Sequence, residues 1–338
     1  MPGKIRLHTA FFLSVLTLVI AAEIHAQHIP VDEWQVHLSY HNATSCLNAF
    51  GKLYVLSDGS LYSYSPDDNS INTYDKTNYL SDNGIGSIAW CKSEKVIVIG
   101  YRNGNIDLLY ENDDVYNITD FLNSNVTDKT ITDIQVVGKK AYISTAYGPI
   151  ILNVEKKQID NSYKLDETPF CSIEYDGRLV CVTRQGTYSG NLSANLLDAT
   201  NWNKIHRYHF IKLIEFDGRL IGCAGDYNVF IMNPEDGSLK SVIYGIKCIS
   251  KSDGKLLILD KQNTLYVYSD ISHYDKYSLL YCPSAPTDIT LADGIYWLSC
   301  GNEGILGYKV SGDALLLSKS GIVPDSPRRN YFNYMDFQ

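Results

Sequence analysis

The sequence predicts an all-β fold, because one short unit with the marks of an antiparallel meander recurs along the chain. The unit is clearest in residues 171–190, CSIEYDGRLVCVTRQGTYSG, which predict three strands separated by two tight turns. Asp176 and Gly177 form the first turn, and Asp-Gly between strand-forming runs is a strong signal for a two-residue hairpin. Gln185 and Gly186 form the second turn.

Seven copies of this unit follow one another. Their first turns align on Gly51, Glu94, Gly138, Gly177, Gly218, Gly254 and Gly294, at intervals of roughly 36 to 44 residues. A four-stranded propeller blade repeats at about 40 to 50 residues. A linear stack would leave exposed sheet edges, whereas a closed ring leaves only short ones. The sequence therefore predicts a seven-bladed β-propeller of four-stranded antiparallel blades over residues 27–320.

The strand before the first turn of a copy is rich in β-branched residues, so we expect it to lie innermost in its blade. Such strands are predicted at 87–90, 131–137, 210–216, 245–251 and 287–292. Strands such as 70–75 are more polar, which is typical of an outer edge. The segment 34–40, WQVHLSY, precedes the first copy. We expect it to pair beside 305–310 and so close the ring, because the first and last blades would otherwise present open edges.

The two ends of the chain differ from this repeat. Lys4 and Arg6 precede an apolar run over 10–22 and a small-residue boundary at Ala26, which predicts a secretory signal peptide over residues 1–26. The alternative is an uncut N-terminal anchor. Residues 321–338 contain two prolines and two arginines and then resume strand-like composition. They are either a linker with the start of a truncated second domain or an ordinary disordered terminus.

The composition of the chain argues against some classes of partner. The formal net charge is −9, and an acidic chain is a poor partner for nucleic acid or for anionic lipid. No apolar run after residue 26 approaches the roughly 18 residues of a membrane span, so no transmembrane segment is predicted once the signal peptide is removed. The 26 tyrosines fit half-buried strands, although exposed tyrosines would also suit carbohydrate binding.

The eight cysteines of an exported chain raise the question of disulfides. In the hairpin at Asp176 and Gly177, Tyr175 is expected to face Arg178, which places Ser172 opposite Cys181 and Cys171 opposite Val182. Cys171 and Cys181 would then point to opposite faces of the sheet. We therefore favour buried free thiols, while the sequence leaves other pairings open.

For each catalytic motif that the sequence suggests, the surrounding residues or the spacing argue against a catalytic role. The glycine-rich segment 84–89 is followed by a strand instead of a helix. His206 and His209 are three residues apart and would point to opposite faces of a strand. Segment 186–190 misses the nucleophile-elbow spacing, and 65–70 lacks the glycine and glutamate of a calcium loop. The sequence predicts no enzyme, no cofactor and no metal site.

The geometry of a propeller nevertheless indicates one face of the ring as a candidate binding surface. The loops between the second and third strands of all blades emerge on the same face, together with the loops that link one blade to the next. Binding residues concentrate on such loops when a rigid scaffold holds them. We expect a candidate binding rim on this face, and its members are Asp58, Arg102, Tyr147, Arg184, Asp226, Lys261 and Glu303.

Several segments resemble a known family. Segments 34–40, 79–90, 96–109 and 131–144 are similar to the N-terminal β-propeller of PorZ-like proteins, and GYRNGNIDLL at 100–109 is the most specific of the likenesses. The closing SPRRNYFNYMDF resembles the passage into the second propeller of that family. The chain ends before that second propeller, so it departs from the full family pattern.

The resemblance implies a role at the surface or in the periplasm of a Gram-negative bacterium with a type IX secretion system. PorZ-like proteins belong to an attachment complex with a sortase-like protease and help to deliver anionic lipopolysaccharide. Protein partners of that complex, or a glycan or lipopolysaccharide, are thus the expected ligands of a non-enzymatic binding or scaffold module. The alternative function is the extracytoplasmic glycan-sensing propeller of a hybrid two-component regulator.

Overall fold

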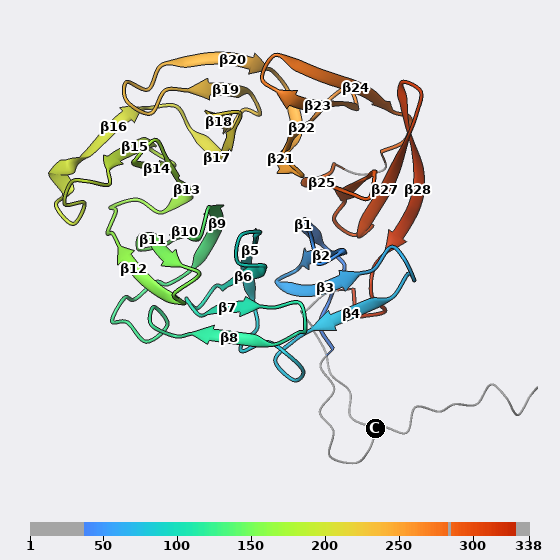
Figure 1. Ribbon diagram of the computed structural model, residues 1–338, viewed down its shortest axis with the longest axis horizontal. Helices are drawn as coiled ribbons and strands as arrows, with labels where there is room; N and C mark the ends of the chain where they lie inside the picture. The colour runs from blue at the N-terminus through green and yellow to red at the C-terminus, as the bar shows by residue number, and fades with distance from the viewer. Residues whose placement is uncertain (1–36, 283–284, 329–338) are drawn as a thin grey trace, which may run out of the picture. The chain divides into compact units, whose positions relative to one another are not determined.

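The computed structural model describes residues 37–282 and 285–328, and these residues are almost entirely β-structure (Figure 1). A 3-10 turn, Ala199–Asn201, is the single helical segment within them. The strands of the first half are β1 (Ala43–Ala49), β2 (Lys52–Ser57), β3 (Ser60–Tyr64), β4 (Ile71–Tyr74), β5 (Ile85–Cys91), β6 (Val96–Tyr101), β7 (Ile106–Leu109), β8 (Val115–Ile118), β9 (Ile131–Val137), β10 (Lys140–Thr145), β11 (Gly148–Asn153), β12 (Gln158–Ser162), β13 (Pro169–Tyr175) and β14 (Arg178–Thr183). Those of the second half are β15 (Gly186–Asn191), β16 (Trp202–His206), β17 (Phe210–Phe216), β18 (Arg219–Ala224), β19 (Val229–Met232), β20 (Leu239–Ile243), β21 (Ile246–Ser252), β22 (Lys255–Asp260), β23 (Thr264–Asp270), β24 (His273–Leu279), β25 (Asp288–Ala292), β26 (Ile295–Ser299), β27 (Ile305–Ser311) and β28 (Ala314–Ile322).

Consecutive strands pair into antiparallel sheets that are arranged radially, as in a β-propeller. The sheets β1–β4, β5–β8, β9–β12, β13–β16 and β17–β20 each have four strands in sequence order. In Figure 1 the first strand of each sheet lies toward the centre and the fourth lies at the periphery. The all-β prediction and the innermost position of the β-branched strands are therefore confirmed.

The last part of the ring differs from the prediction of separate four-stranded sheets. There, β21–β24 and β25–β28 join into one eight-stranded sheet in the order β21-β22-β23-β24-β28-β27-β26-β25. The junction is a short parallel pairing, Ser278↔Ala314 and Leu279↔Leu315, between the two outermost strands. At nine residues, β28 is long enough to reach its neighbour. The unpaired edge of β24 is thereby partly covered.

The predicted first turn and its register are confirmed, whereas the second turn is formed by Arg184 and Gln185 instead of Gln185 and Gly186, because Gly186 already pairs with Thr183. Asp176 and Gly177 have φ of 50° and 69°, as a type I′ turn requires at both central positions. Across this turn Tyr175 pairs with Arg178, Ser172 with Cys181 and Cys171 with Val182. The side chains of Cys171 and Cys181 accordingly lie in different apolar clusters. Six of the cysteines are buried free thiols: Cys46, Cys91, Cys171, Cys181, Cys223 and Cys248.

The apolar core lies between neighbouring sheets. One cluster packs Val98 and Leu108, from β6 and β7, against Ile131 and Ile143, from β9 and β10. Similar clusters fill the other junctions described by the structure. A single sheet cannot bury its own apolar faces, so these faces are buried against the neighbouring sheets of the ring.

The segment predicted to close the ring does not do so. Residues 37–40 form no strand, and residues 34–36 lie outside the described residues. Instead β27 pairs with β26 and with β28, so the C-terminal strand β28 supplies the outer edge of the last blade. The ring closes through an isolated bridge in which Ala43 N–H donates to Gly301 O at 2.9 Å and Gly301 N–H donates to Ala43 O at 3.0 Å.

The ends of the chain are described only in part. The predicted signal peptide, residues 1–26, and residues 329–338 lie outside the described residues. Strand β28 runs to Ile322, two residues beyond the predicted end of the propeller, and Val323 packs into the cluster between the first and last blades. In the part of the chain that the structure describes, no helix has the length and apolarity to cross a membrane.

The substitution Tyr62→Phe tests the contact between the first and last blades. The buried Tyr62 hydroxyl donates to Ile322 O at 2.9 Å and so joins β3 to the end of β28. Its loss leaves a buried carbonyl unpaired, which we expect to lower the free energy of unfolding by about 1 kcal/mol in a urea titration. Tyr274→Phe, at an exposed position on β24, is the control and should leave stability unchanged. Equal stabilities for the two variants would contradict this closure.

Candidate functional site

The loops predicted to share one face are held together by backbone hydrogen bonds. The N–H of Arg102, after β6, donates to Gly84 O, before β5, at 3.0 Å. The N–H of Lys261, after β22, donates to Gly245 O, before β21, at 2.9 Å. The same bond joins Asp58 to Asn42, Ala146 to Thr130 and Gly225 to His209. The loop between the second and third strands therefore lies against the segment that leads into the same blade, and we call this surface the loop face.

Every residue of the predicted rim lies in a loop between the second and third strands of its sheet. Tyr147 and Glu303 are half-buried, and the other members are exposed: Asp58, Arg102, Arg184, Asp226 and Lys261. Tyr147 packs against an apolar cluster between blades, so its ring serves the core. Around the ring the members occupy separate blades, and two regions beside them combine exposed rings or a pocket with polar side chains.

The first region surrounds Asp226 and Lys261. Tyr208, Phe210, Phe230 and Tyr244 form a run of edge-to-face contacts with ring centroids 5.5 to 6.4 Å apart. With Tyr227 these residues constitute what we call the aromatic sector. Its exposed rings are Tyr227, 46% exposed, and Tyr244, 65% exposed.

Polar groups are fixed at the edge of the aromatic sector. The Tyr208 hydroxyl donates to the Asp226 carboxylate, which also accepts from Asn228 Nδ2 at 2.9 Å. This hydrogen bond to the carboxylate raises the pKa of Tyr208. Lys261 Nζ lies 5.6 Å from the centroid of the Tyr227 ring, within cation–π range. Exposed rings beside oriented carboxylate, amide and ammonium groups can bind a polyhydroxylated or peptide ligand.

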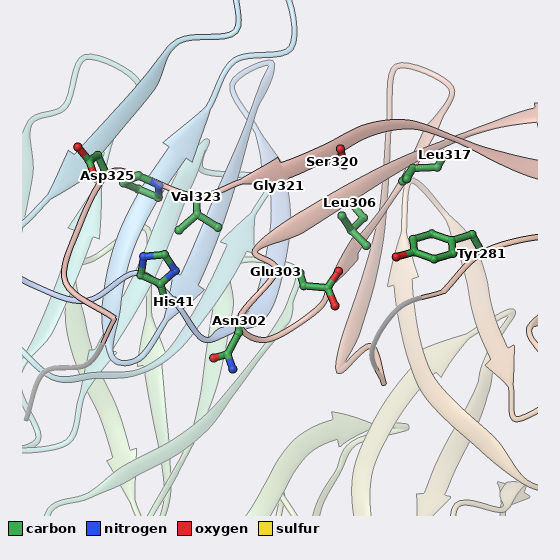
Figure 2. A pocket seen from close by; sticks show the side chains of 11 residues that line it. His41, Tyr281, Asn302, Glu303, Leu306, Leu317, Ser320, Gly321, Val323 and Asp325 are labelled. Atoms are coloured by element: carbon green, nitrogen blue, oxygen red, sulfur yellow. The ribbon is translucent and has the colours of Figure 1, made fainter.

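The second region is a pocket of about 690 Å³ beside Glu303, which we call the closure pocket (Figure 2). It lies where the last blade meets the segment before β1. Its apolar wall comes from Leu306 and Leu317, and the ring of Tyr281 lies beside that wall. Glu303 contributes a carboxylate, and His41 lies toward the other end.

A third group of polar side chains lies at the ring centre. Lys212, on β17, donates to Ile249 O at 2.9 Å and lies 4.0 Å from the carboxylate of Asp288, on β25. Burial raises the pKa of Asp133, on β9. Together with Gln135, Lys212 borders a cavity of about 280 Å³ between the innermost strands β9, β13, β17 and β21. The ion pair links blades across the ring, so we assign it to stability.

In the part of the chain that the structure describes, the motifs weighed as catalytic in the sequence lie on strands and in the loops that join them. In the described residues there is no group of three or more His, Cys, Asp or Glu side chains that could hold a metal ion. His206 ends β16 and stacks near Phe210, whereas His209 lies before β17 against Phe170. The glycine-rich segment 84–89 leads into β5, and 186–190 lies within β15.

Exposed tyrosines of the loop face are functional candidates that the predicted rim does not include, apart from the half-buried Tyr147. Tyr79, Tyr227, Tyr244 and Tyr281 lie in loops on this face and are 43 to 65% exposed. The abundance of tyrosine in the sequence predicts half-buried strand positions, and buried strand residues such as Tyr62 fit that expectation. Tyr79, Tyr227 and Tyr244 each lie next to asparagine or glycine, residues common in turns, and this is the sequence signal that favours a loop position for these three.

Part of the sequence matches a known family model. It describes the N-terminal β-propeller domain of PorZ from the type IX secretion system, and it matches residues 53–203. Over residues 53–203 the chain is therefore similar to the PorZ N-terminal propeller. The solved structure of PorZ from Porphyromonas gingivalis is similar with a TM-score of 0.75 at 21% identity. The match covers 90% of this chain and 41% of the PorZ chain, so the PorZ-like propeller spans about two fifths of the protein that it matches.

Other solved propellers share the fold of this chain. The extracellular domain of a putative hybrid two-component system from B. thetaiotaomicron has a TM-score of 0.55 at 14% identity, over 81% of this chain and 40% of that chain. Virginiamycin B lyase from Staphylococcus aureus has a TM-score of 0.60 at 10% identity, over 82% and 98%. Among curated proteins, none matches the sequence. At these identities the likeness is one of fold.

Proposed function

We propose that this chain is a non-catalytic, exported binding or scaffold module, a seven-bladed propeller that acts in a type IX secretion attachment complex. The count of seven treats the eight-stranded sheet as two blades. Its halves, β21–β24 and β25–β28, are each four-stranded antiparallel meanders, and only a short parallel pairing joins them.

The observation that carries the proposal is the unequal distribution of exposed apolar side chains between the loops of the two faces. Five large exposed hydrophobic side chains lie in loops of the loop face: Tyr79, Tyr227, Tyr244, Leu280 and Tyr281. In the loops at the opposite end of the strands only one described residue, Leu197, is of this kind. Exposed rings are costly to hydrate and are enriched at binding surfaces. The loop face is therefore the side on which we expect a partner.

Export is part of the proposal and is supported by the relatives. PorZ is described as an essential bacterial surface component of the type IX secretion system, and the B. thetaiotaomicron domain is described as extracellular. The basic, apolar and small residues of positions 1–26 point in the same direction. We propose that the chain works in the periplasm or at the cell surface of a Gram-negative bacterium.

The test measures binding by the chain without residues 1–26. The probes are purified anionic lipopolysaccharide and the purified sortase-like protease of the attachment complex. We expect saturable binding of at least one probe. Replacing both Tyr227 and Tyr244 by alanine should weaken that binding about tenfold, because exposed aromatic anchors carry much of an interface's binding energy.

A matched control uses tyrosines exposed to a similar degree on outer strands. Tyr116, 45% exposed on β8, and Tyr274, 50% exposed on β24, are replaced by alanine together. This variant should bind as the parent does. Binding of neither probe would refute the proposed function, and equal weakening in both double variants would refute its assignment to the loop face.

The second candidate function is glycan sensing, favoured by the likeness to the extracellular domain of the hybrid two-component system. A glycan array separates the two. Binding of a neutral oligosaccharide, with no binding of either secretion-system probe, would favour the sensor. Turnover of any bound polysaccharide would overturn the non-catalytic assignment in both cases.

A further inference from the structure

The closure pocket carries two carboxylates that the described part of the protein leaves unpaired. Glu303 lies in the loop between β26 and β27, and Asp325 lies in the segment that follows β28. Within residues 37–282 and 285–328 neither carboxylate accepts a hydrogen bond or forms an ion pair. Burial raises the pKa of Tyr308, and the negative charge of Glu303 adds a smaller contribution in the same direction. The pocket therefore has a negative potential that no described cation neutralises.

Two further polar groups of the pocket can accept hydrogen bonds, in addition to the donors that Asn302, Ser320 and Tyr281 offer. His41 contacts Ser326 O at 3.2 Å through Nε2, and a carbonyl can only accept, so Nε2 carries the proton. In the neutral ring Nδ1 is then an acceptor. The side-chain carbonyl of Asn302 is another acceptor beside Glu303 (Figure 2).

The opposite wall suits a long aliphatic chain. Leu306 and Leu317 form an apolar surface, and the Tyr281 ring, 55% exposed, lies beside it with its hydroxyl toward Glu303 (Figure 2). The Tyr281 backbone is anchored, because its carbonyl accepts from the Tyr308 hydroxyl at 3.0 Å. Lysine and arginine bury their methylene groups against such surfaces and place the cationic head at a carboxylate or over an aromatic ring.

We propose that the closure pocket binds a lysine or arginine side chain on an extended segment of a partner protein. A volume of about 690 Å³ exceeds one side chain and accommodates a few residues. Leu280, 69% exposed next to Tyr281, offers apolar contact to a residue adjacent in the partner segment. Glu303 pairs with the cation, and Asp325 faces a second basic group or the polar backbone of the segment.

This assignment rests on the proposed function, because the pocket opens beside a rim residue, and it adds the chemistry of the partner. It does not involve the aromatic sector. The pocket assignment and the proposed function can therefore be refuted independently. Short probe peptides test the pocket without any secretion-system component.

The experiment titrates the chain without residues 1–26 with capped peptides and follows backbone amide resonances by NMR. The probes are Ac-Gly-Arg-Gly-Leu-NH2, its lysine analogue and its glutamine analogue. We expect the basic peptides to bind with shifts at Asn302 and Gly321, and the glutamine peptide to bind at least about fivefold more weakly, since hydrogen bonds to charged groups are the stronger ones. Binding of the basic peptides should weaken as salt rises.

Glu303→Gln is expected to reduce affinity for the arginine peptide about fivefold, and Glu303→Gln with Asp325→Asn to abolish the difference between arginine and glutamine peptides. Glu235→Gln, at an exposed carboxylate between β19 and β20 on the opposite face, is the matched control and should change nothing. Equal binding of the glutamine and arginine peptides to the parent would overturn the proposal, as would an unchanged affinity in Glu303→Gln.

Two further outcomes are informative. If glucosamine binds at Asn302 and Gly321 and the basic peptides do not, the pocket takes a cationic sugar and the peptide assignment is wrong. If the protease or lipopolysaccharide binds the parent and Glu303→Gln with Asp325→Asn equally well, the pocket has no part in that contact. The proposed function would then stand and this inference would fall.

Discussion

Asp288→Ala is expected to lower the free energy of unfolding by about 3 kcal/mol, because it removes the carboxylate that forms the ion pair with the Lys212 ammonium at the ring centre. The Asp288 carboxylate also accepts from Ser45 Oγ at 2.9 Å and from Cys46 N–H at 3.2 Å. One side chain of β25 thus holds β17 and β1 from either side. Since the Lys212 side chain is 34% exposed, water offsets part of the loss. Urea titration measures the change.

Asp275→Ala, at an exposed aspartate on β24, is the control and should change stability by no more than about 0.5 kcal/mol. The pairing itself is measured by a double-mutant cycle with Lys212→Met. We expect a coupling energy of about 1 kcal/mol or more between positions 212 and 288. Additive effects of the two substitutions would show that the ion pair does not stabilise the ring.

Gly86→Ala is expected to destabilise the propeller by about 3 kcal/mol through a steric clash between two innermost strands. Gly86 lies on β5, and a Cβ placed there would approach Ile131 O of β9 to 2.2 Å. The clash is with backbone, so no side-chain rotation relieves it. The neighbouring Gly100 on β6 meets the side chain of the same isoleucine, at 2.8 Å.

The matched control for Gly86→Ala is Gly177→Ala. Gly177 has φ of +69°, and no heavy atom lies within 4 Å of its Cβ position, so alanine adds backbone strain without a clash. We expect a loss of about 1 kcal/mol there. Thermal and urea unfolding of both variants compare the two effects. A Gly86 variant as stable as the Gly177 variant would mean that β5 and β9 are not in such close contact.

The turns and the register were predictable because they depend on neighbouring residues. Asp176-Gly177 encodes a type I′ turn through the φ preference of glycine and aspartate, and once the turn is set every pair along β13 and β14 follows. The position of Cys171 and Cys181 on opposite faces follows in the same way. The placement of every rim residue between second and third strands is also a consequence of local turn signals.

Ring closure was not predictable in this way. The segment 34–40 has strand-like composition, yet β28 takes the edge beside β27. The contacts that decide this choice, such as Tyr62 to Ile322, join residues 260 positions apart. No local propensity reports them, because the two candidate segments are equally compatible with an extended backbone.

The hairpin units, with their first turns, strand faces and spacing, follow from the amino-acid sequence, since those features depend on backbone preferences over a few residues. Contacts between distant parts of the chain set which strand completes the last blade, bring the exposed rings of Tyr227 and Tyr244 to the loop face, and place Glu303 and Asp325 at one pocket. Those juxtapositions arise when each sheet buries its apolar faces against its neighbours around the ring. The candidate binding surface therefore forms only when the ring of sheets is closed.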